Sequence, residues 1–148
     1  MALFLRFFVI AFAFFLGCFA AAATLMFTSL PADVIRSPLN DVDRAVLWWS
    51  VLTATALISS IAFLPAMIGI LMAEAFAWRS VLFYTIAGGI GGLIYGLTFP
   101  EGTSMDYANR TTEITAAAGV AAGLVYWLVA GRRAGNWRGP SAKVGENI

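Results

Sequence analysis

Glu74 and Arg79 stand five residues apart between two long apolar stretches of the chain, and they are the first residues to consider for chemistry. One prediction is that they form an ion pair that fixes the turn between two apolar helices, with both charged groups reaching toward water. The alternative is that Glu74 binds a proton or a cation, because a carboxylate next to an apolar span is a default functional candidate.

Hydroxyl side chains are concentrated in the apolar stretch that precedes Glu74. One interpretation is that they hydrogen-bond to carbonyls of their own helix or to neighbouring helices. The alternative is that they line a polar path for a solute, with Glu74 at one end. The residues concerned are Ser50, Thr53, Thr55, Ser59 and Ser60.

The inventory of side chains excludes several chemistries. The chain has no histidine and one cysteine, Cys18. Haem ligation by histidine, Cys–His catalysis, a Ser–His triad and an intrachain disulfide are therefore excluded. We expect no cofactor and no enzymatic activity, and we expect Cys18 to be a buried small apolar residue. Acidic loop residues could hold a hard metal ion, so a membrane enzyme is a third alternative.

Composition indicates the environment of these residues. Of the 148 residues, 61% are hydrophobic and 11% are charged, whereas a globular domain has about 25% charged residues. The net charge of +1 argues against a nucleic-acid partner. Long runs without charged residues predict an all-α integral membrane bundle of four transmembrane helices, arranged as two antiparallel helical hairpins. The spans are expected at about 7–30, 46–73, 80–99 and 113–131, within one domain of residues 1–133.

Turn and cap residues predict the ends of these helices. Ser37-Pro38 resembles a helix start, with Asp41 and Asp43 near it, where the helix dipole favours anions. Pro65 is expected to bend the second span. Asn109 or Thr111 is expected to cap the fourth span, and the tail of residues 134–148 is expected to be disordered. The short link 74–79 predicts an antiparallel hairpin of the second and third spans.

The first apolar stretch has two interpretations. Arg6, an apolar run and the sequence Ala20-Ala21-Ala22-Ala23 resemble a secretory signal peptide. The apolar run continues through Phe27, however, which is long for a signal peptide. We therefore expect this stretch to be retained as a membrane span.

Two sets of glycines recur at four-residue intervals, which places each set on one face of a helix. Such small-residue faces let membrane helices approach to backbone contact. The two faces are expected to pack on each other within the monomer or, alternatively, on a second copy or a partner. The glycines are Gly88, Gly92 and Gly96 in the third span and Gly119 and Gly123 in the fourth.

Basic residues predict the orientation. With four spans both termini lie on one side, which carries six of the nine basic residues: Arg6, Arg79, Arg132, Arg133, Arg138 and Lys143. The positive-inside rule then places the N- and C-termini in the cytoplasm.

Two segments resemble a known kind of protein. Glu74-Ala-Phe-Ala-Trp-Arg79, continuing to Gly88-Gly89, and Tyr126-Trp127-Leu-Val-Ala-Gly131-Arg132-Arg133-Ala-Gly135 are similar to segments of small, uncharacterised four-span inner-membrane proteins of alphaproteobacteria. The resemblance covers mainly the second half of the chain. It implies a bacterial inner-membrane location and no particular activity.

These observations favour a non-enzymatic structural, accessory or assembly protein that packs through small-residue helix faces. Its partners would be the lipid bilayer and either itself or a larger membrane protein complex. The alternative function is a small oligomeric solute or ion transporter or channel that uses Glu74 and the hydroxyls of the second span.

Overall fold

The chain folds into long helices in the computed structural model, which describes residues 2–30, 40–76, 78–99 and 105–133. Within these ranges there is no strand, and four helices are long and apolar enough to cross a membrane. They are α1 (Ala2–Ser29), α3 (Asp41–Phe76), α4 (Val81–Thr98) and α5 (Met105–Val129), followed by the short 3-10 helix η1 (Gly131–Arg133). The predicted all-α bundle of four apolar helices is confirmed. The expected tail 134–148 and the helix start at Ser37-Pro38 lie outside the described residues.

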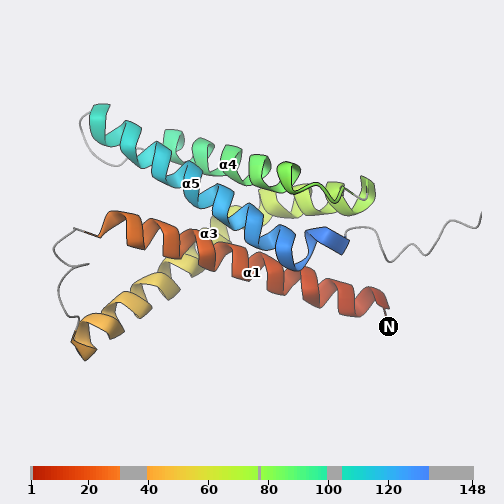
Figure 1. Cartoon of the computed structure of the whole chain (residues 1–148), viewed down its shortest axis with the longest axis horizontal. Coiled ribbons are helices and arrows are strands. Elements are labelled where there is room, and N and C mark those ends of the chain that lie inside the picture. Colours follow the sequence, from red (N-terminus) through yellow and green to blue (C-terminus); the bar gives the residue numbers. More distant parts are fainter. Residues whose placement is uncertain (1, 31–39, 77, 100–104, 134–148) are drawn as a thin grey trace, which may run out of the picture.

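α5 is the central helix of the packing. It packs most extensively against α4 and next most extensively against α1, whereas α3 packs mainly against α1. Figure 1 shows the chain reversing direction between α1 and α3 and between α4 and α5, so the two predicted antiparallel hairpins are present. The chain also reverses between α3 and α4, but in the described residues these two helices make few direct contacts.

Small residues of α1 are buried where it packs against the neighbouring helices. Ala13 and Ala22 are fully buried, and Ala21 and Cys18 are nearly so. A Cβ added at Gly17 would lie 3.1 Å from the carbonyl oxygen of Ala122 in α5, so the two backbones approach closely there. α1 is thus an integral part of the packed bundle, and the expected burial of Cys18 is confirmed.

α3 is longer than its apolar stretch. It begins at Asp41, with Asp43 in the first turn. The Asp43 amide donates to Asn40 Oδ1 at 2.8 Å and the Asn40 amide donates to Asp43 Oδ2 at 3.3 Å, which is a reciprocal cap. At 1.5 Å per residue, the 36 residues of α3 span about 54 Å, well beyond the ~30 Å of hydrocarbon in a bilayer. The helix must therefore tilt or extend beyond the apolar layer.

Pro65 lies inside α3. A proline in a helix lacks the amide hydrogen that would bond the carbonyl four residues earlier, which favours a bend. In Figure 1 the ribbon of α3 runs diagonally behind α1 and then changes direction. Its first half therefore diverges from the rest of the bundle, in agreement with the predicted bend.

The expected cap of the fourth span is wrong. α5 begins at Met105, so Asn109 and Thr111 lie within the helix. The prediction placed the helix start at the edge of the charge-free run. Arg110 and Glu113 are exposed on α5, and a helix can continue past the apolar layer when its charged side chains reach water.

Candidate functional site

A part-buried ion pair joins three elements at one end of the bundle. Arg6 Nε of α1 donates to Glu74 Oε1 of α3 at 3.1 Å, and Arg6 Nη2 donates to the same oxygen. Arg6 Nη2 also donates to the carbonyl oxygen of Ala130, just after α5, at 2.9 Å. The two side chains are only 14% and 13% exposed. One guanidinium therefore ties α1 to the last turns of both α3 and α5.

Helix dipoles explain this arrangement. Glu74 lies in the last turn of α3, where the partial negative charge of the helix end disfavours a carboxylate. The guanidinium of Arg6 offsets that cost and also lies at the negative end of α5, where a cation is favoured. Because burying an unpaired charge is costly, each member of the pair depends on the other.

Aromatic side chains enclose this end of the bundle. The rings of Tyr84 and Tyr126 lie 5.4 Å apart between centroids, and both belong to the buried cluster that includes Ala73 and Ala130. The Tyr84 hydroxyl donates to the carbonyl oxygen of Trp78 at 3.0 Å. This bond fixes the α3–α4 linker on the first turn of α4.

The structure places Arg79 in the same linker. Its carbonyl oxygen accepts a hydrogen bond from Trp127 Nε1 of α5 at 2.8 Å, and its side chain is exposed. Glu74 and Arg79 thus both lie at this end of the bundle. Glu74 forms its ion pair with Arg6, 68 residues earlier in the chain.

Sequence reasoning did not select Arg6 as the partner of Glu74. A usable pattern existed, because α1 and α3 run in opposite directions and Arg6 and Glu74 lie at the ends that an antiparallel pair brings together. The buried tyrosines Tyr84 and Tyr126 were also not singled out. In the sequence they resemble the tyrosines that lie at the membrane–water interface, because both are near the ends of apolar stretches. Only the tertiary packing shows that their rings contact each other.

The glycines of α4 and α5 meet along a line that we call the glycine seam: Gly88, Gly92 and Gly96 against Thr115, Gly119 and Gly123. A Cβ added at Gly88 would clash with the carbonyl oxygen of Gly119, and one at Gly119 would clash with that of Gly88. A Cβ at Gly92 would clash with the Thr115 carbonyl, and one at Gly123 with the Tyr84 carbonyl. The two glycine faces therefore meet within one molecule.

Four of the five hydroxyl residues singled out in α3, all except Ser50, bond within their own helix. Thr53, Thr55, Ser59 and Ser60 each donate to the carbonyl oxygen four residues earlier, at 2.6–2.8 Å. Thr53 and Ser60 are exposed, whereas Ser59 is buried. These four hydroxyls are thus satisfied without a solute and do not share one face of the bundle.

The third alternative from the sequence is a membrane enzyme in which acidic loop residues bind a metal ion. Among the residues that the structure describes, no group of three or more Cys, Asp or Glu side chains is placed to hold a metal ion. Several of the acidic loop residues, including Asp33 and Glu101, lie outside the described ranges.

Comparison of the chain with protein-family models, with curated proteins and with solved structures finds no match. The interpretation of the site therefore depends on its own geometry.

Proposed function

We propose that this multi-pass membrane protein is a non-enzymatic structural or accessory component that docks onto a larger membrane protein complex. The main support for this proposal is the exposed apolar surface of α3. Along 36 residues only Val51, Ser59, Ile70 and Ala73 are buried, whereas Leu57, Leu64 and Ile68 are more than half exposed. A helix with so few buried residues along its length presents a long apolar face to a neighbour.

The glycine seam supports the same proposal. Its glycines serve packing within the monomer, where small residues let two membrane helices approach closely. Those faces are then occupied, so a partner would dock elsewhere. Among the described helices, α3 carries the most exposed large apolar side chains.

Transport is the second candidate, and the Arg6–Glu74 pair is the observation that favours it. Ionisable residues near membrane spans often mark ion or proton routes. Against transport, the guanidinium is bonded to both Glu74 and Ala130, and the α3 hydroxyls are bonded to their own helix. The pair therefore has a structural role that needs no solute.

We also propose a bacterial inner membrane as the location, with both termini in the cytoplasm. The segments around Glu74 and Tyr126 resemble alphaproteobacterial inner-membrane proteins, and this resemblance supports the inner membrane as the location. The excess of basic residues on the side of the termini supports the orientation.

Particle size in a mild detergent tests the accessory function. The protein, extracted from its own membrane, is expected to elute in a particle that contains other polypeptides and is heavier than its 15.8 kDa monomer plus detergent. Leu64→Trp on the exposed face of α3 should release the monomer, and Ile90→Trp on the exposed face of α4 should not. A monomer in every case would contradict docking.

Flux into proteoliposomes tests the alternative. The accessory function predicts no flux of protons or monovalent cations above that of empty liposomes. Flux that is lost in Glu74→Gln, while the variant still inserts and folds, would replace the proposal with transport.

A further inference from the structure

A hollow opens where the α3–α4 linker meets the first turn of α4. Its volume is about 380 Å³, and it is lined by Trp78, Arg79, Ser80 and Phe83. It lies at the end of the bundle that carries the Arg6–Glu74 pair, since the linker begins directly after α3. α3 and α4 make few direct contacts, so aromatic side chains rather than helix packing occupy the space between their ends.

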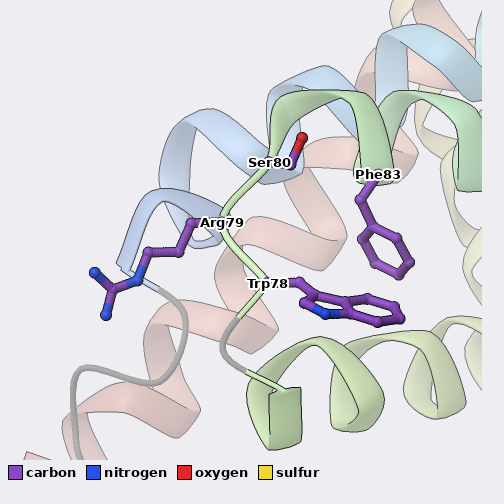
Figure 2. A pocket seen from close by; sticks show the side chains of 4 residues that line it. All are labelled: Trp78, Arg79, Ser80 and Phe83. Atoms are coloured by element: carbon purple, nitrogen blue, oxygen red, sulfur yellow. The ribbon is translucent and has the colours of Figure 1, made fainter.

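The hollow is apolar on the side of Trp78 and Phe83, and the charged group of Arg79 extends outward from its other edge. The Trp78 and Phe83 ring centroids lie 4.6 Å apart, and Phe76 stacks on Trp78 at 5.3 Å. Figure 2 shows the rings of Trp78 and Phe83 together on one side of the linker and the Arg79 guanidinium directed away from them. An apolar platform next to a cation suits an amphiphile, and aromatic residues are enriched where membrane meets water.

A second cation is held beside the linker. The Trp127 indole donates to the Arg79 carbonyl, and the guanidinium carbon of Arg132 lies 4.7 Å from the centre of the Trp127 ring. Both Arg79 and Arg132 are exposed. Arg79 contacts Trp127 through its backbone and Arg132 contacts it through its guanidinium, so two exposed arginines lie at this end of the bundle and favour an anionic ligand there.

We propose that this hollow binds an anionic phospholipid of the surrounding bilayer. The phosphate is bound by the Arg79 guanidinium and the Ser80 hydroxyl, with Arg132 adding to the positive field. The glycerol and the start of the acyl chains lie on Trp78 and Phe83. Basic pockets near the ends of membrane helices are known to bind anionic headgroups, and the hollow lies at the end of four membrane-spanning helices.

Native mass spectrometry of the purified full chain tests this site. The protein in a non-ionic detergent is incubated with phosphatidylglycerol or with phosphatidylcholine, and the retained lipid is counted. We expect the anionic lipid to be retained about fivefold more per basic residue engaged. Arg79→Gln should reduce that preference toward parity, Arg132→Gln should lower it in part, and Arg79→Lys should keep most of it.

Arg44 and Trp49 supply matched controls, because both are exposed and lie near the opposite end of α3. Arg44→Gln should leave the preference unchanged, and Trp78→Ala should lower retention of the anionic lipid more than Trp49→Ala does. Equal retention of the two lipids, or an equal loss in Arg44→Gln and Arg79→Gln, would overturn the proposal. Full displacement of the lipid by inorganic phosphate would show a simple anion site and would also overturn it.

Discussion

Arg6 and Glu74 are placed so that one ion pair meets several requirements at once. The Glu74 carboxylate lies at the C-terminal end of α3, where the helix dipole disfavours a negative charge. The Arg6 guanidinium donates hydrogen bonds both to that carboxylate and to the Ala130 carbonyl oxygen just after α5. Such a pair adds little net stability compared with an apolar pair, but either half alone is costly. Its main effect is therefore to specify which helix ends come together.

Breaking one half of this pair should destabilise the fold. Glu74→Gln is expected to lower the free energy of unfolding by about 3 kcal/mol, because the Arg6 guanidinium stays buried without a counter-charge. The measurement is unfolding in mixed detergent micelles as the denaturing fraction of SDS rises. Glu113→Gln, at an exposed site on α5, is the matched control and should have little effect.

The double variant Arg6→Met with Glu74→Met separates charge from packing. It should be more stable than either single substitution, since neither charge is then left unpaired. Losses that simply add would contradict a coupled pair.

At the scale of the elements, the glycine seam explains why α4 and α5 are the most closely packed helices. Neighbouring glycines of α4 differ sharply in their surroundings. A Cβ at Gly92 would clash with the Thr115 carbonyl, whereas nothing lies within 4 Å of a Cβ at Gly91. The four-residue spacing of the seam glycines thus has a direct steric meaning.

This contrast gives a paired prediction. Gly92→Ala should destabilise the protein by about 1–3 kcal/mol through overpacking. Gly91→Ala should be neutral or stabilising by up to about 1 kcal/mol, because alanine is the better helix former. The same SDS titration measures the stability of both variants. Equal effects at the two positions would contradict the close backbone contact between α4 and α5 at Gly92.

The packing of α1 makes a second prediction at this scale. Ala13 and Ala22 are fully buried, and Arg6 is bonded to α3 and to the end of α5. Removal of α1 would expose these contacts, so α1 should remain in the mature protein. Intact mass measurement of the protein from its native membrane should include these residues, and a mass that begins after Ala23 would contradict the structure.

At the scale of the molecule, the sequence was sufficient for the helix class, the four apolar helices and the two hairpins, because apolar length and turn residues act locally. It was insufficient for the helix ends, since α3 and α5 continue into charged segments where exposed side chains reach water. It also missed Arg6 as the partner of Glu74, because that contact depends on packing between residues 68 positions apart. Ala21 and Ala22 resemble the end of a signal peptide in the sequence, although both are buried in the folded bundle.

Orientation is a property of the whole molecule. In a Cys18→Ala background, the substitutions Ser80→Cys and Asn40→Cys place one thiol at each end of the bundle. Cytoplasmic termini predict that a membrane-impermeant thiol reagent labels the Asn40→Cys variant in intact cells. The same reagent should label the Ser80→Cys variant only after lysis. The reverse pattern would invert the topology.

Site-specific photo-cross-linking in intact membranes shows whether a partner protein covers the exposed face of α3. A photoreactive amino acid replaces Leu64, which is 74% exposed on α3, or Ile90, which is 54% exposed on α4. We expect a cross-link from position 64 to a defined polypeptide and only lipid adducts from position 90. Lipid adducts alone at both positions would contradict it.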